Sequence, residues 1–240
     1  MQSEPCHHTQ LEALRRQISQ LEGILPLRKA PAISSGCEAL DQILPEQGFL
    51  NGTLVEWLAE GDGTGATALA LLAASQACRS GGGFVVVDAS REFYPPAAVR
   101  EGIDPARLIV VQPGGKADLR WALDQSLRST AVAAVMAWPD SRAETLDGRT
   151  FRRLQLAAEE GGGLGLLIRP QSVLRRPSWA RVRLLVEPLP NPSFHGGKRR
   201  FRVFLLHGRG VAGERCAEVE IDDETHLVPM AARLPGLAKP

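Results

Sequence analysis

Hydrophobic and polar positions change in a regular rhythm along the chain. Short continuous apolar runs, such as 84–88, alternate with segments whose apolar residues recur every three or four positions, such as 149–160. A continuous apolar run is typical of a buried parallel strand, and three- and four-residue spacing indicates an amphipathic helix. Repeated strand–helix units predict an α/β fold, a three-layer sandwich around a mostly parallel sheet. The predicted strands are 53–58, 84–88, 108–111, 131–137 and 164–168, and the predicted helices are 95–101, 118–128, 149–160 and one from residue 66.

Two helices have informative beginnings. The segment after Gly65 is almost entirely Ala and Leu up to Ala74, which indicates a helix buried on all sides. Earlier in the chain, Ser35 with Glu38 three residues later predicts a capping box, followed by the apolar face of a short helix.

The pattern changes at both ends of this core. Leucine and isoleucine recur at helical spacing over 11–25, which predicts an amphipathic helix that packs on its own domain or docks on a partner. After Pro170, strands at 181–187, 201–207 and 216–221 follow without helices between them and predict an antiparallel extension. We therefore divide the chain into an N-terminal helix and linker (1–32), a core (33–180) and an extension with its tail (181–240).

A glycine-rich loop between the first core strand and the following helix has the layout of a phosphate-binding loop. Aligned on G-x-x-x-x-G-K-[ST], the chain has Glu60 at the first glycine, Ala66 at the lysine and Thr67 at the hydroxyl position. The backbone of the motif is thus present without its cation. The degenerate loop comprises Glu60, Gly61, Asp62, Gly63, Thr64, Gly65, Ala66 and Thr67.

The core resembles the RecA family in three blocks: SSGCEALDQIL at 34–44, the strand–loop–helix at 55–72, and 83–113. That resemblance implies a RecA-like fold with a lysine, a metal-binding carboxylate and a water-positioning glutamate. The matching positions here are Ala66, Ala137 or Trp138, and Ser90. We therefore expect no catalytic residue, cofactor or metal, the alternative being an ATPase that uses Asp140 or Glu92 instead.

A RecA-like core with a degenerate loop and a basic C-terminal part is similar to the ImuA family, which is also related to the division inhibitor SulA. The resemblance implies a non-catalytic accessory role in damage-induced translesion synthesis. The implied partners are RecA, an ImuB-like polymerase-related protein and, indirectly, an error-prone C-family polymerase. A SulA-like inhibitor of cell division is the alternative.

Charge is distributed unevenly although the net charge is only +1. Residues 169–209 contain ten basic residues and one acidic residue, a local charge of +9, interleaved with Trp179, Phe194 and His195. This composition favours single-stranded DNA, with an acidic protein partner or a plain solvated face as alternatives. The candidate binding residues are Arg175, Arg176, Arg181, Arg183, Lys198, Arg199, Arg200, Arg202 and Arg209.

The cysteine content and the apolar segments bear on the cellular compartment. The four cysteines are widely spaced and form no C-x-x-C pair, which is typical of reduced thiols rather than of disulfides or a metal site. With no long apolar segment, we expect a cytoplasmic protein that does not enter a membrane.

Overall fold

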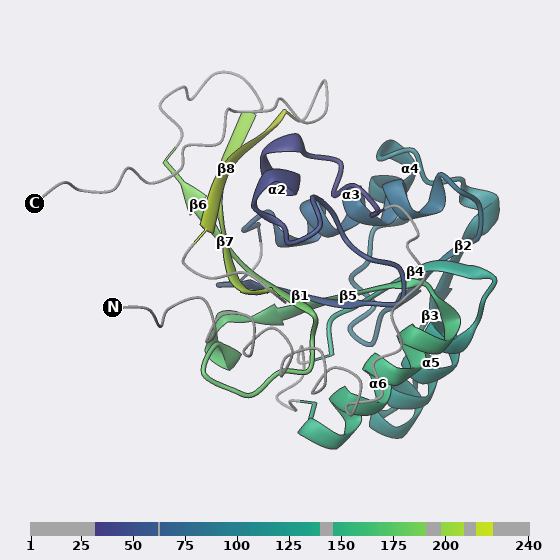
Figure 1. Cartoon of the computed structure of the whole chain (residues 1–240). Helices are drawn as coiled ribbons and strands as arrows, with labels where there is room; N and C mark the ends of the chain where they lie inside the picture. The colour runs from purple at the N-terminus through teal and green to yellow at the C-terminus, as the bar shows by residue number, and fades with distance from the viewer. Residues whose placement is uncertain (1–31, 62, 140–145, 191–197, 209–214, 223–240) are drawn as a thin grey trace, which may run out of the picture. The chain divides into compact units, whose positions relative to one another are not determined.

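The structure is a computed structural model that describes residues 32–61, 63–139, 146–190, 198–208 and 215–222 (Figure 1). Within these ranges one eight-stranded sheet has the order β3-β2-β4-β5-β1-β6-β7-β8. Neighbours from β3 to β6 pair in parallel, and β7 and β8 add antiparallel. The predicted α/β class with a mostly parallel sheet is confirmed. The strands are β1 Leu54–Ala59, β2 Gly83–Val87, β3 Leu108–Val111, β4 Val132–Ala137, β5 Leu164–Pro170, β6 Val182–Leu189, β7 Lys198–Gly208 and β8 Arg215–Asp222.

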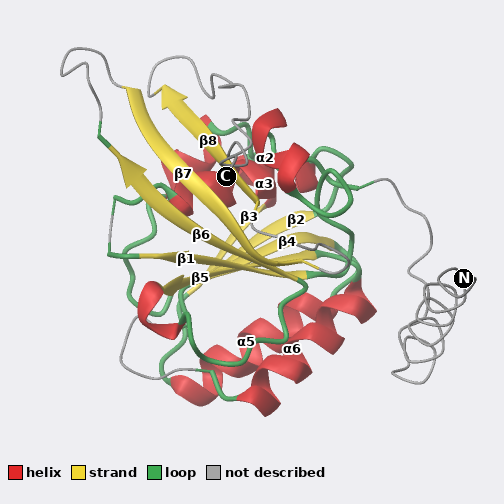
Figure 2. Ribbon diagram, turned by 60° about the vertical axis from the view of Figure 1, so that its left-hand side comes forward, coloured by secondary structure: helices red, strands yellow, loops and turns green. Residues whose placement is uncertain are grey.

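Helices cover both faces of the parallel part of the sheet (Figures 1 and 2). Residues of α2 (Glu38–Ile43), α3 (Ala66–Cys78) and α4 (Pro95–Arg100) join one hydrophobic cluster, and residues of α5 (Lys116–Arg128) and α6 (Gly148–Gly161) join another. Two short 3₁₀ turns, Pro105–Arg107 and Gln171–Val173, connect elements. The three-layer arrangement places one set of helices on each face of the sheet, because each amphipathic helix buries its apolar stripe there.

The helix α3 is the most deeply buried of these helices. Its buried residues run from Ala66 to Ala77 and include Leu69 and Leu71, and it contacts β1, β2, β4 and β5. The prediction that this Ala- and Leu-rich segment is surrounded by other elements is confirmed.

The extension differs from its prediction in one respect. The strand β6 pairs in parallel with β1 and in antiparallel fashion with β7, so the antiparallel part of the sheet begins only after β6. Val182 to Val186 are all buried, as expected of a strand covered on both faces. The connection from β5 is long enough to cross β1 and return to the edge of the sheet where the parallel strands begin. The strands β7 and β8 instead alternate, with Phe201, Val203 and Val219 facing the core.

The predicted capping box is wrong. The helix α2 begins after Cys37 and has no side-chain cap. Ser35 Oγ accepts a bond from Cys37 N at 3.2 Å, while the Asp41 carboxylate accepts from Ser35 N at 2.7 Å and from Ser34 Oγ at 2.6 Å. A carboxylate inside the helix thus fixes the preceding turn, an interaction that the capping pattern does not anticipate.

The predicted helix at 11–25 lies outside the described residues, and the proposed domain boundaries stay predictions. Among the described helices, none is both long and apolar enough to cross a membrane.

Candidate functional site

The glycine-rich loop leaves the carboxyl end of β1 and enters α3 directly. Gly61, Gly63 and Gly65 have positive φ angles of 77°, 75° and 85°, and Gly65 is the N-cap of α3. These left-handed positions require glycine, since a β-carbon would be strained there. Thr64 Oγ1 donates to the Gly61 carbonyl at 3.2 Å and closes the turn. Asp62 lies outside the described residues.

The start of α3 is packed rather than open. Ala66, at the position of the expected lysine, is buried. A β-carbon added at Gly65 would lie only 2.6–2.7 Å from three carbons of the Phe201 ring, so this ring of β7 rests against the loop. The guanidinium of Arg199 lies 5.9 Å from the centroid of the same ring. The C-terminal extension therefore packs on the loop.

Three positions singled out from the sequence meet in one cavity of ≈ 380 Å³. Thr67 comes from the first turn of α3, Ser90 from the segment after β2, and Trp138 from the position directly after β4. Because β2 and β4 are parallel neighbours, their carboxyl ends lie at the same edge of the sheet. The remaining lining residues are Leu71, Asp88, Glu92, Phe93, Tyr94 and Ala97.

Asp88, at the end of β2, is occupied in shaping this cavity. Its Oδ1 accepts from Ser90 Oγ at 3.1 Å and from the backbone N–H groups of Arg91 and Glu92 at 2.9 and 3.3 Å. Its Oδ2 accepts from Phe93 N at 3.0 Å. The residue is 1 % exposed, so its carboxylate organises the loop rather than facing solvent.

The two residues considered as catalytic substitutes have different outcomes. Glu92 lines the cavity and is exposed, whereas Asp140 lies outside the described residues. No cluster of three or more His, Cys, Asp or Glu side chains suited to a metal ion occurs in the described ranges.

The predicted basic stretch does not form one surface. Arg183 and Arg169 are buried beside Glu56, whose carboxylate forms ion pairs with both. Arg183 also donates to the carbonyls of Val173, Leu174 and Arg176 at 2.7–3.2 Å. Arg183 thus holds the turn after β5 and is not accessible to a ligand.

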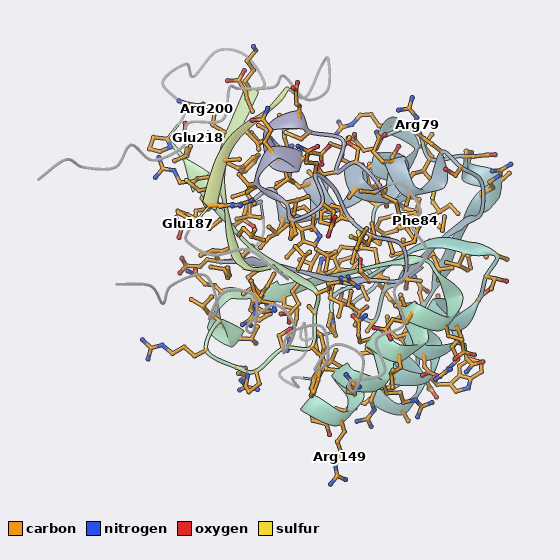
Figure 3. All side chains as sticks on the ribbon, in the orientation of Figure 1. Arg79, Phe84, Arg149, Glu187, Arg200 and Glu218 are labelled. Atoms are coloured by element: carbon orange, nitrogen blue, oxygen red, sulfur yellow. The ribbon has the colours of Figure 1, made fainter. Side chains whose placement is uncertain are left out.

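Cations on β7 are matched by carboxylates on β8. Lys198 pairs with Glu220 at 3.1 Å, and Arg202 pairs with Glu218 at 2.7 Å. Glu218 also pairs with Arg200 at 3.1 Å (Figure 3). The register places Arg202 opposite Glu218, so these charges largely neutralise one another.

The other candidates are dispersed. Arg175 and Arg176 are exposed after β5, while Arg181 and Arg199 are half-buried. Arg209, like Phe194 and His195, lies outside the described residues.

Two arginines that the sequence analysis did not single out lie beside Trp179. The guanidinium of Arg152 lies 4.7 Å from the Trp179 ring centroid, and both residues line a shallow depression with Arg149 and Asp147 at the start of α6. Arg149 extends outward from α6 (Figure 3). Asp147 accepts from Thr150 N at 2.7 Å, and this bond holds the pKa of its carboxyl below the ordinary value. The signal was the i, i+3 spacing of Arg149 and Arg152, which is equally typical of an ordinary solvated helix face.

Comparison with known proteins fits this architecture. The sequence model of the RecA N-terminal domain family matches residues 17–144. Protein ImuA of Caulobacter vibrioides is 32% identical over 198 residues, covering 75% of this chain and 80% of the relative. Protein RecA of Rhodopirellula baltica is 27% identical over 141 residues, covering 57% of this chain and 37% of the relative. Protein RecA of Chlorobaculum parvum is 36% identical over 105 residues, covering 44% of this chain and 30% of the relative. The chain therefore belongs to the ImuA family, whose core is related to RecA.

Proposed function

We propose that this chain is a non-catalytic, RecA-like accessory protein of damage-induced translesion synthesis. It acts by binding RecA, an ImuB-like polymerase-related protein, single-stranded DNA, or a combination of these. The observation that carries the proposal is the cavity at the ends of β2 and β4. There, the positions expected to hold a water-orienting acid and a metal carboxylate are Ser90 and Trp138.

Phosphoryl transfer depends almost entirely on positioned charge, because the transition state spreads negative charge over the transferred group. Loss of one such electrostatic group typically slows catalysis about a hundred- to a thousand-fold. Here Ala66 replaces the cation as well, and the ring of Phe201 packs against the loop. Three simultaneous losses need not multiply, but they leave the γ-phosphate without a counter-charge.

The depression around Trp179 supplies a surface for single-stranded DNA. Trp179 is 47 % exposed and offers an aromatic face for a base, and Arg149 and Arg152 offer cations for phosphates. Arg175 adds a further exposed cation from the turn after β5. This surface is distinct from the ion pairs between β7 and β8.

A complementation experiment tests the proposal in the host that encodes the chain. Deletion of the gene should lower damage-induced mutation frequency, and the wild-type chain should restore it. Copurification from damaged cells should recover RecA or the ImuB-like protein. A deletion strain whose damage-induced mutation frequency is unchanged would contradict the accessory role.

A further inference from the structure

We propose that the cavity at the ends of β2 and β4 binds the guanidinium group of an arginine side chain from a protein partner. This inference rests on the proposed non-catalytic role, because a nucleotide would compete for the same region. Three features carry it: the charge of the lining, its aromatic character and the rigidity of the loop that forms one wall.

The lining is negatively charged. It contains the exposed carboxylate of Glu92 and the buried, hydrogen-bonded carboxylate of Asp88, and no lysine, arginine or histidine among the described residues. Arg91 lies between them in sequence but does not line the cavity. A cleft lined by one sign of charge concentrates ligands of the opposite sign, so the cavity favours a cation over a phosphate.

The walls are aromatic. Phe93 and Trp138 are half-buried with ring centroids 6.2 Å apart and an interplanar angle of 43°, and Tyr94 is 68 % exposed. Aromatic faces attract cations through the ring quadrupole, and tryptophan does so most strongly. An exposed tyrosine and an exposed Glu92 beside half-buried rings also make the cavity reachable from solvent.

The loop between β2 and α4 is held before any ligand arrives. Asp88 binds the backbone N–H groups of Arg91, Glu92 and Phe93, so both Glu92 and Phe93 are fixed at their backbones. Binding therefore requires little ordering of this wall, which preserves affinity for a small group.

Arginine fits these features better than other cations. Its planar guanidinium stacks on aromatic faces and forms paired bonds to a carboxylate, whereas an ammonium is compact and strongly hydrated. A bare metal ion would need several oxygen or nitrogen ligands, and the described residues contain no suitable cluster here. The carboxylate of Glu92 is the expected partner of the guanidinium.

The test uses N-acetyl-arginine methylamide as the probe and the neutral, similarly shaped citrulline derivative as its control. Tryptophan fluorescence is recorded on the full chain carrying Trp121→Phe and Trp179→Phe, which leaves Trp138 and the fully buried Trp57. We expect saturable binding of the arginine probe with a dissociation constant of about 1–10 mM. The citrulline probe should bind about tenfold more weakly or not at all.

Two variants of equal charge change separate the cavity from the general surface. Glu92→Gln should weaken binding of the arginine probe about tenfold, because a charge-assisted bond is removed. Glu60→Gln removes an exposed carboxylate outside the cavity and should change it less than about twofold.

Several results would overturn the inference: no saturable signal up to about 50 mM probe, equal binding of citrulline, or equal effects of the two variants. Each leaves the proposed function standing if ATP is not hydrolysed. Hydrolysis of Mg-ATP that the arginine probe inhibits would instead contradict the proposed function itself.

Discussion

Glu56 lies in the middle of the sheet with a fully buried carboxylate between two arginines. Arg169 and Arg183 reach it from the neighbouring strands β5 and β6. Arg183 Nε lies 2.8 Å from Glu56 Oε2, but both atoms lack the alignment of a hydrogen bond, so we describe the interaction as an ion pair. Arg169 also lies over the ring of Phe151 in α6, at 5.2 Å. Glu56 thus supports the turn after β5 through Arg183 and the helix α6 through Arg169. These two segments border the depression around Trp179.

Replacing Glu56 by glutamine should destabilise the protein by about 3–5 kcal/mol, because two buried guanidinium groups lose their counter-charge. Urea unfolding measures this change. Glu60→Gln, at an exposed position, is the control and should shift stability by less than about 0.5 kcal/mol. A decrease below about 1 kcal/mol for Glu56→Gln would show that the arginines do not depend on it.

Asp124 of α5 provides a pH-dependent link to α6. It accepts from Arg153 Nε at 2.8 Å and from Arg128 Nε at 3.1 Å, and these bonds hold the pKa of its carboxyl below the ordinary 3.8. Because the folded pKa is the lower one, the stabilisation is present above pH 3.8 and is lost as the pH falls through the folded value. Asp124→Asn should lower stability by about 1–3 kcal/mol at neutral pH. In thermal unfolding, the difference in melting temperature between Asp124→Asn and the wild type should disappear in acid. A gap independent of pH would contradict the assignment.

At the scale of elements, two glycines of the loop before α3 have the same backbone conformation but different surroundings. Gly65 has a positive φ, and a β-carbon added there would meet the Phe201 ring, while Gly61 has a similar φ and nothing within 4 Å of an added β-carbon. Substitutions at Gly61 and Gly65 therefore distinguish the cost of backbone strain from the cost of packing against Phe201.

Gly61→Ala should destabilise the chain only through backbone strain, whereas Gly65→Ala should be worse by about 1–3 kcal/mol because the ring must move. Denaturant midpoints of both variants measure the difference. When the ring is removed by Phe201→Leu, the added cost of Gly65→Ala should be smaller. Gly65→Ala/Phe201→Leu should therefore differ less from Phe201→Leu than Gly65→Ala differs from the wild type. Equal destabilisation by both glycine variants would mean that the extension does not press on the loop.

Elements with strong periodicity could be predicted from the sequence, and long-range partners could not. The helix at 149–160 was predictable from its three- and four-residue apolar spacing. The strand at 108–111 and the buried helix from Ala66 were distinguished by length and residue type, because a short β-branched run favours a strand and a long run of Ala and Leu favours a helix. The parallel pairing of β6 with β1 was not, because strand direction depends on the path of the connection. The charge count over 169–209 stopped short of Glu218 and Glu220, whose pairing with β7 is visible only in the strand register. The cavity likewise joins Ser90 and Trp138, which follow two different strands, β2 and β4.

At the scale of the whole molecule, the basic charge divides into a neutralised part and an exposed part. Arg200 and Arg202 share Glu218, whereas Arg149 and Arg152 lie beside Trp179. DNA binding, if it follows exposed charge and stacking, should therefore depend on α6 rather than on β7.

Affinity for an oligothymidylate, measured by fluorescence anisotropy over a range of salt, should separate these surfaces. Arg149→Gln/Arg152→Gln should reduce the salt slope by about 0.7 for each phosphate that is no longer neutralised. Trp179→Ala should cost about 1–3 kcal/mol of stacking. The matched pair Arg200→Gln/Arg202→Gln should leave the slope nearly unchanged. The opposite ranking would move the DNA surface to the β7–β8 edge.

We propose that this RecA-like core, which lacks the cation, the metal anchor and the water-orienting acid of an ATPase, works through binding alone. The most direct measurement is ATP hydrolysis by the purified chain with magnesium and single-stranded DNA present. We expect phosphate release no faster than in the absence of protein. Turnover that copurifies with the chain and disappears in Thr67→Ala or Glu92→Gln would show instead that the chain is an ATPase.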